Sequence, residues 1–127
     1  MPDEQPAPRR TTVLDGHHEL TVRSLTRADA SFTVDYSITP PLPDDLATGP
    51  ATEPLFLWLE AEDDLGNAYT DYGGARGLSP DGRSTEGRIS GQPALPAGAT
   101  ALTVRFVFLT GGTEQPHPLT LPVPPGA

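Results

Sequence analysis

Apolar and polar residues alternate with a period of two along much of this chain, which is the spacing of β-strands. The clearest stretch covers residues 31–39, whose apolar residues all fall on one face: Phe32, Val34, Tyr36 and Ile38. Residues 18–25 alternate in the same way around Leu20 and Val22. No stretch keeps helical spacing together with helix caps, so the pattern predicts an all-β protein.

The same reasoning predicts five further strands, over residues 55–62, 67–72, 84–90, 100–110 and 117–123. A short additional strand over 11–14 is suggested by Asp15-Gly16, a dipeptide that favours hairpin turns. The Gly-rich residues 73–82 predict a loop. Seven strands separated by turn signals indicate one antiparallel β-sandwich over residues 11–123.

Four prolines in and around the last predicted strand stand at positions of one parity. Pro116, Pro118, Pro122 and Pro124 share one parity, and the alternate positions hold Leu119, Leu121 and Val123. Because backbone N–H groups alternate sides along a strand, these prolines remove donors from one side only. That side cannot belong to a hydrogen-bonded ladder, so the sequence predicts an edge strand whose free side faces solvent.

The two ends of the chain differ from its centre. Residues 1–10 are polar with prolines at positions 2, 6 and 8, and residues 124–127 are similar, so both predict disordered tails. The start lacks the apolar region of a signal peptide, and no apolar run reaches the roughly 18 residues of a membrane span. The expectation is a cytoplasmic protein, or an exported one if a leader has been removed.

Charge and composition narrow the possible functions. Seventeen acidic residues oppose eight basic ones, giving a net charge of −9. Such a charge repels a phosphate backbone, so nucleic acid is not an expected partner. The chain contains no cysteine, which excludes disulfides, thiolate metal sites and cysteine nucleophiles. No motif indicates a cofactor.

Three segments together resemble immunoglobulin-like and fibronectin-type-III-like sandwiches. They are the strand from Phe32 to Ile38, the strand containing Phe56 and Trp58 that turns at residues 63–69, and the Leu-Pro step of residues 95–104. The Asp-x-x-Gly-x-x-Tyr hairpin followed by Leu-Pro-x-x-Ala-x-x-Leu-x-Val also resembles small bacterial sandwich domains of unknown function. The resemblance covers residues 18–123 and implies a seven-stranded immunoglobulin-like fold. It departs from that family in lacking the cysteine pair and in placing Leu102 where a tyrosine is expected.

Polar residues offer few candidates for chemistry. In a fibronectin-like sandwich the first and last strands lie close, so His18 and His117 can approach each other, but zinc requires three or four ligands. Acidic residues gather around the hairpin of residues 60–71 without the spacing of an EF-hand, which leaves calcium at Asp63, Asp64 and Asp71 open against a solvated hairpin tip. No nucleophile elbow or phosphate loop is present, so an enzyme is not expected.

The most informative feature is that residues 55–62 and 100–110 are apolar on both faces. Only one face of each strand can point into a core. The two strands are neighbours in the immunoglobulin-like arrangement, so their outer faces form one patch, which is covered either by the chain's own loops or by a partner. We expect Trp58 and Glu60 to point outward, because Glu60 then meets Arg105 across the strand pair.

These observations favour a non-catalytic protein-binding or assembly module. It meets a second copy or another protein through the outer sheet face. The alternative is a small-molecule or carbohydrate binder in which Trp58, Tyr69 and Tyr72 are stacking platforms. The candidate binding residues are Phe56, Trp58, Glu60, Tyr69, Tyr72, Arg105 and Val107.

Overall fold

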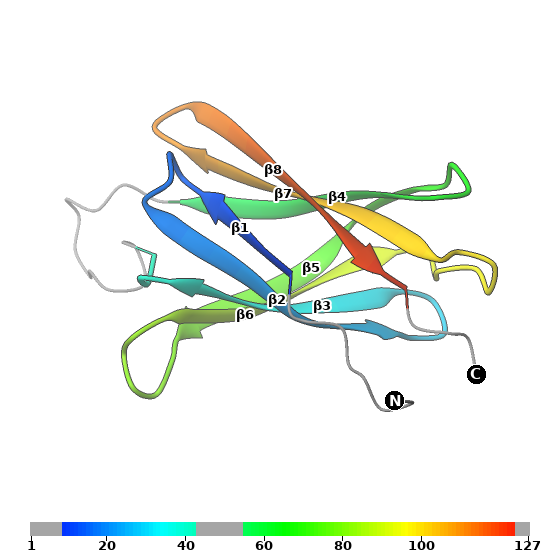
Figure 1. Ribbon diagram of the computed structural model, residues 1–127, viewed down its shortest axis with the longest axis horizontal. Coiled ribbons are helices and arrows are strands. Elements are labelled where there is room, and N and C mark those ends of the chain that lie inside the picture. The colour runs from blue at the N-terminus through cyan, green and yellow to red at the C-terminus, as the bar shows by residue number, and fades with distance from the viewer. Residues whose placement is uncertain (1–8, 43–54, 124–127) are drawn as a thin grey trace.

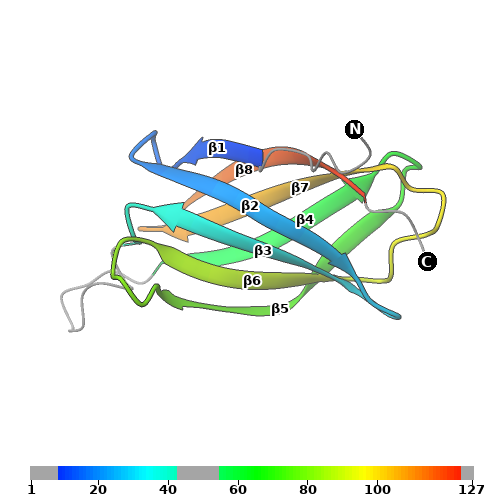
Figure 2. The same cartoon turned by 60° about the horizontal axis from the view of Figure 1, so that its bottom comes forward.

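The computed structural model describes residues 9–42 and 55–123, in which the chain forms eight antiparallel β-strands (Figure 1). They are β1 (Arg9–Val13), β2 (His18–Arg27), β3 (Phe32–Thr39), β4 (Phe56–Asp63), β5 (Ala68–Leu78), β6 (Thr85–Gln92), β7 (Ala101–Thr110) and β8 (Thr113–Pro122). All eight belong to one sheet in the order β1-β2-β3-β6-β5-β4-β7-β8. Its two ends, β1 and β8, contact each other, so the sheet is nearly closed (Figure 2).

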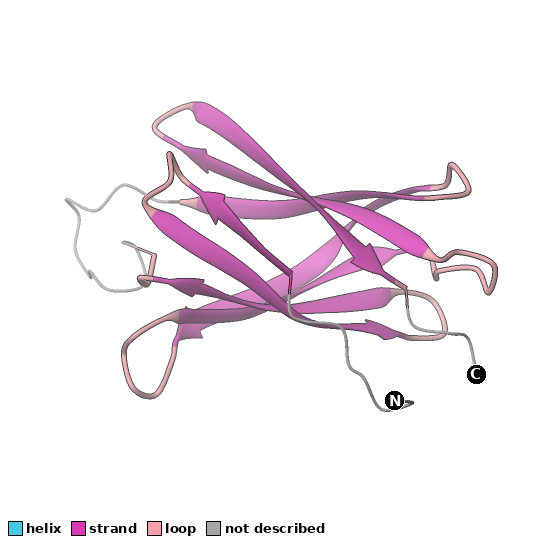
Figure 3. Cartoon of the chain, viewed as in Figure 1, coloured by secondary structure: helices cyan, strands magenta, loops and turns pink. Residues whose placement is uncertain are grey.

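Every regular element in the described part of the chain is a strand, as Figure 3 shows by colour. The all-β, antiparallel prediction is therefore confirmed. Those residues contain no helix that is long and apolar enough to cross a membrane.

The strand count differs from the prediction of seven strands in a sandwich, since eight strands are joined in one sheet. The additional strand is β1, which begins at Arg9 and Arg10, two residues that composition had placed in the N-terminal tail. They pair with Val22 and Thr21 of β2. The tails predicted for residues 1–8 and 124–127 lie outside the described residues.

Two other strands are longer than predicted. β5 continues through Gly73 and Gly74 to Leu78, where a loop was expected, because β6 pairs with it along this whole stretch. β8 begins at Thr113 rather than at His117, because Gly111 and Gly112 both adopt positive φ and close a tight turn after β7.

The core forms from the inward-facing residues of nearly all strands. The four apolar residues predicted for β3 are buried, and so are Leu102, Val104, Phe106 and Phe108 of β7. Tyr36 of β3 meets Phe106 edge to face, with ring centroids 5.9 Å apart. Strands that are distant in the sheet therefore contact each other inside it, and their aromatic rings add specific packing to the area they bury.

β8 is an edge strand, as its prolines predicted. It stands at one end of the sheet order and pairs with β7, where Pro116 lies opposite Val107 and Pro118 opposite Arg105. Since proline cannot donate, the N–H groups of the residues between them must form the ladder to β7. The other side of β8 has lost three of its donors to Pro116, Pro118 and Pro122, and β1 lies against it without a paired register in the described residues.

Two glycines of β6 make room for core rings. A Cβ atom at Gly91 would overlap the ring of Phe32, and one at Gly87 would overlap the phenol of Tyr36. Gly77 of β5 has no atom within 4 Å of the position of its missing Cβ and does not require positive φ. Replacing Gly91 by alanine therefore tests the packing against Phe32. Replacing Gly77 by alanine measures the general cost of substituting a glycine in a strand.

We predict that Gly91→Ala lowers the free energy of unfolding by about 1–3 kcal/mol, the usual cost of overpacking a core. Gly77→Ala is the matched control and should change it by about 0.5 kcal/mol or less. Urea unfolding of both variants measures the difference. Equal changes in the free energy of unfolding for the two variants would show that Gly91 does not lie as close to the ring of Phe32 as in this structure.

Candidate protein-binding surface

The outward-facing residues of β4, β7 and β8 form one continuous surface, which we call the outer face. The strand register places Trp58 opposite Val107, which in turn lies opposite Pro116. One step along the strands, Glu60 lies opposite Arg105. Because side chains on one face follow every second residue, these residues are neighbours on the same side of the sheet.

Glu60 is the organising side chain of the outer face. Arg105 donates a hydrogen bond from Nη1 to Oε1 of Glu60 at 2.8 Å. The indole Nε1–H of Trp58 donates to Oε2 of the same carboxylate at 3.3 Å. The hydrogen bonds from Arg105 and Trp58 lower the pKa of Glu60 and outweigh the opposing effect of burial. The prediction that Trp58 and Glu60 point outward, with Glu60 meeting Arg105, is confirmed.

Val107 shows that the outer face is already packed around Trp58. Only 2% of Val107 is exposed, although it points away from the core and is not part of the core cluster. Its cross-strand neighbours are Trp58 and Pro116, so these two side chains cover it. Phe56, one step beyond Trp58, remains 56% exposed. An apolar end of the outer face is therefore presented to solvent.

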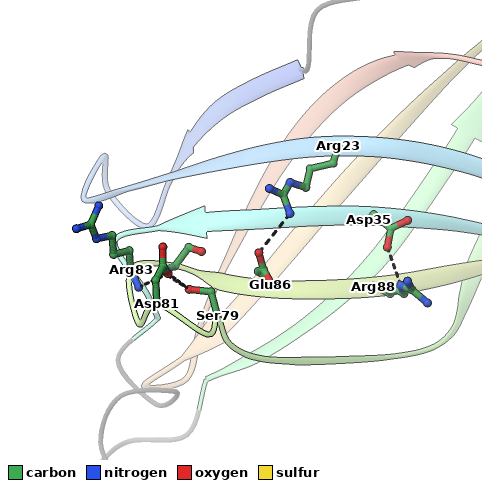
Figure 4. Close-up of polar contacts among 8 residues, drawn as sticks. Arg23, Asp35, Ser79, Asp81, Arg83, Glu86 and Arg88 are labelled. Atoms are coloured by element: carbon green, nitrogen blue, oxygen red, sulfur yellow. Dashed lines mark hydrogen bonds and ion pairs between the residues drawn. The ribbon is translucent and has the colours of Figure 1, made fainter.

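The outward side of β2, β3 and β6 is different in character. Arg23 pairs with Glu86 at 3.2 Å, and Arg88 pairs with Asp35 at 2.8 Å (Figure 4). Exposed ion pairs of this kind contribute little to stability and keep a surface well solvated. The apolar positions of the outer face are thus a local property of β4, β7 and β8.

Tyr69 and Tyr72 do not join the outer face as binding residues in the way that the sequence suggested. Tyr69 is 3% exposed, packs edge to face on Phe32 and donates a 2.6 Å hydrogen bond to Asp63. It belongs to the core, so its assignment as a stacking platform is wrong. Tyr72 is 63% exposed and lies at the irregularity between Asp71 and Gly73 of β5.

Two pockets of about 420 and 180 Å³ lie among the described residues, and their walls share Tyr36, Ala75, Arg76 and Arg88. Trp58, Tyr69 and Tyr72 line neither of these two pockets, so the carbohydrate-binding hypothesis gains no support from them.

The acidic residues considered for calcium each accept hydrogen bonds from a different part of the protein. Asp63 accepts hydrogen bonds from the backbone N–H groups of Leu65 and Asn67 as well as from side chains. Asp64 accepts from the backbone and hydroxyl of Thr100. The carboxylate oxygens of Asp71 accept from Leu59 and Gly73. In residues 9–42 and 55–123 no group of three or more His, Cys, Asp or Glu residues could hold a metal ion.

Asp63 is a buried carboxylate with several donors around it. Burial raises its pKa, but the hydrogen bonds from Tyr69, Asn67 and Leu65 outweigh that effect and lower the pKa to about 2. The hydrogen bond between Tyr69 and Asp63 has the opposite effect on the tyrosine. Burial, this hydrogen bond and the Asp63 charge all raise the pKa of Tyr69. The pair holds the β4–β5 hairpin against the core.

The two histidines that the sequence analysis brought together have different partners. His18 Nδ1 lies 2.8 Å from the carbonyl oxygen of Pro40. His117 Nε2 accepts a hydrogen bond from the backbone N–H of Leu14 at 3.3 Å. Each histidine therefore makes a hydrogen bond to the backbone of another segment of the chain.

Sequence reasoning placed Leu109 on the outer face of its strand but did not include Leu109, Pro116 or Pro118 among the candidate binding residues. The Gly111-Gly112 turn sets the register of β8 against β7, so that Pro116 lies in one row with Trp58 and Val107, and Leu109 lies in the next row opposite Phe56. Comparison with known proteins adds no candidate, since no family model, no curated protein and no solved structure matches this chain significantly.

We predict that Trp58→Ser lowers the free energy of unfolding by about 1 kcal/mol or less, because the indole lies outside the core. Phe106→Ala, the comparison in the core, should cost about 3–5 kcal/mol. Chemical denaturation followed by far-ultraviolet circular dichroism measures both without relying on tryptophan fluorescence. A loss for Trp58→Ser as large as that for Phe106→Ala would place the indole in the core.

We also predict that the Asp63 carboxyl titrates near pH 2, as followed by carboxyl carbon NMR. Since its folded pKa is below the unfolded value of 3.8, its contribution to stability is complete above pH 3.8 and is lost as the pH falls towards 2. Tyr69→Phe removes one donor and should raise the midpoint, whereas Tyr72→Phe should leave it unchanged. An unaltered midpoint in Tyr69→Phe would contradict the assigned contact.

Proposed function

We propose that this protein is a non-catalytic binding module that recognises another protein through the outer face of β4, β7 and β8. The observation that carries the proposal is the fixed indole of Trp58, which is held by Glu60 beside an exposed Phe56. A preorganised aromatic side chain loses little conformational freedom on binding, and tryptophan is frequent among residues that dominate interfaces.

The charges on the outer face favour a partner surface that is basic as well as apolar. Arg105 is paired with Glu60, whereas Glu62 and Glu114 are exposed on the same face, so the face carries a net negative charge. The whole chain has a net charge of −9. A partner surface that joins apolar side chains to Lys or Arg complements both features, whereas a second copy would bring further acidic groups against Glu62 and Glu114.

The mode of contact follows from the edge of the sheet. β8 borders the outer face, and Pro116, Pro118 and Pro122 remove most of the backbone donors on the side away from β7. Addition of a partner strand to β8 is therefore disfavoured. The partner must contact side chains on the flat face, which places Trp58 at the centre of the contact and the acidic residues at its rim.

We propose further that the strand arrangement is a variant of the immunoglobulin-like sandwich. The partial orders β2-β3-β6 and β5-β4-β7-β8 support this proposal, because they are the strand groups expected for the two layers of a fibronectin-like domain. Here β5 pairs with both β4 and β6, so the two groups are joined, and β1 adds an eighth strand.

The binding proposal is tested by selecting random linear peptides displayed on phage against the wild-type protein, with counter-selection against Trp58→Ser. We expect the enriched peptides to combine aromatic or aliphatic residues with Lys or Arg. Their affinity should fall at least tenfold for Trp58→Ser, and should weaken as salt is raised. Arg88→Ser, on the ion-paired side of the molecule, is the matched control and should bind like the wild type.

Two results would contradict the proposal. The first is enrichment of peptides that bind Trp58→Ser as tightly as the wild type, or that lack basic residues. The second is a concentration-dependent dimer in sedimentation analysis of the wild type that Trp58→Ser abolishes, because the outer face would then be occupied by a second copy.

A further inference from the structure

The two ends of the sheet meet at a seam between β1 and β8. The strands contact each other, but no paired register joins them in the described part of the chain. The prolines of β8 disfavour such a ladder, because they remove most of the donors on the side that faces β1. A hydrogen bond from the backbone N–H of Leu14, just after β1, to Nε2 of His117 on β8 crosses the seam at 3.3 Å.

The backbone next to this hydrogen bond is in an unfavourable conformation. Leu14 and Asp15 have φ angles of 54° and 61°, in the left-handed region that residues other than glycine, asparagine and aspartate rarely adopt. Leu14 is nevertheless 8% exposed and belongs to the core cluster. The turn therefore depends on the contacts of Leu14, including the hydrogen bond to His117, to keep this conformation.

The contacts of His117 determine which nitrogen of its neutral ring carries the proton and in which direction its pKa is shifted. Because Nε2 accepts a hydrogen bond, the neutral ring carries its proton on Nδ1. The ring is half-buried and lies edge to face on Phe108 of β7, with centroids 5.7 Å apart. Burial lowers the pKa of His117, and the carboxylate of Asp15 opposes this effect.

The other groups around His117 at the seam come from the turn between β1 and β2, from β7 and from β8. From the turn between β1 and β2, Asp15 is the charged group that acts on the ring, and His18 is directed to the carbonyl of Pro40. β7 presents the uncharged Phe108, and the same side of β8 carries Gln115 and Leu119. Arg9 and Arg10 stand at the other end of β1.

We propose that His117 is a pH-sensitive latch, whose protonation breaks the hydrogen bond from Leu14 and releases the turn between β1 and β2 from β8. An imidazolium has N–H donors at both nitrogens, so the N–H of Leu14 loses its acceptor and meets another donor. The left-handed backbone at Leu14 and Asp15 then has one contact fewer to hold it. The seam opens there while the ladders elsewhere in the sheet remain.

The direction of the pH dependence follows from the folded and unfolded states of His117. Its folded pKa lies below the unfolded value of 6.5, so the folded state favours the neutral ring. The latch therefore makes its full contribution above pH 6.5, and this contribution is lost as the pH falls from there through the lower pKa of the folded state. Protonation of His117 in the folded protein is the condition that opens it.

The latch is tested by amide hydrogen exchange of Leu14, measured by NMR at about pH 7.5 and about pH 5 and corrected for the intrinsic rate. In the wild type we expect the protection of Leu14 to fall at least tenfold at the lower pH, while amides in the β4–β7 ladder keep theirs. This experiment uses the full chain and does not depend on any binding partner.

Two substitutions of His117 separate the latch from a purely structural role. His117→Gln places an amide oxygen where Nε2 lies but does not titrate, so Leu14 should stay protected at both pH values. His117→Phe keeps the ring against Phe108 but has no acceptor, so Leu14 should exchange rapidly at both. His18→Gln is the control and should behave like the wild type.

Retention of Leu14 protection by the wild type at a pH where the NMR shifts of the His117 ring report protonation would overturn the latch. An equal loss of protection in His117→Gln would also overturn it, because another group would then cause the opening.

Discussion

The ladder between β4 and β7 is the constraint on which the rest of the structure depends. It runs the full length of β4, and both strands are apolar on both faces, so the register alone decides which residues enter the core. Leu59 and Phe106 face inward, whereas Trp58 and Val107 face outward. A slip of β4 by one residue would turn Trp58 and Glu60 towards the core, while Arg105 of β7 stayed on the outer face. The ion pair between Glu60 and Arg105 is therefore consistent with this register and with no neighbouring one.

The ends of the sheet follow from a second constraint, the missing donors of β8. Pro116, Pro118 and Pro122 share one parity, so they allow a ladder with β7 and disfavour one with β1, and the sheet approaches closure without completing it. The same prolines protect the border of the outer face from strand addition. They also leave the seam dependent on side-chain contacts, among them the hydrogen bond between Leu14 and His117.

The sequence predicted the parts of this molecule that depend on alternation and on proline. The inward face of β3, the edge position of β8 and the contact between Glu60 and Arg105 are examples. It did not predict that β5 continues through Gly73 and Gly74, because paired glycines favour loops and nothing local shows that β6 will pair with them. Tyr69 was misassigned for a related reason. Its place opposite the inward-facing Ala61 depends on the hairpin register, which local composition does not reveal.

The central claim is that the only tryptophan of the chain lies on the outer face, fixed by Glu60 against Val107. Nuclear Overhauser effects from the indole protons of Trp58 test it most directly, because they identify which side chains surround the ring. We predict contacts to the methyl groups of Val107 and to Pro116, with none to Phe106. Contacts to Phe106 or Val104 in place of Val107 would show that β4 presents its other face to the core.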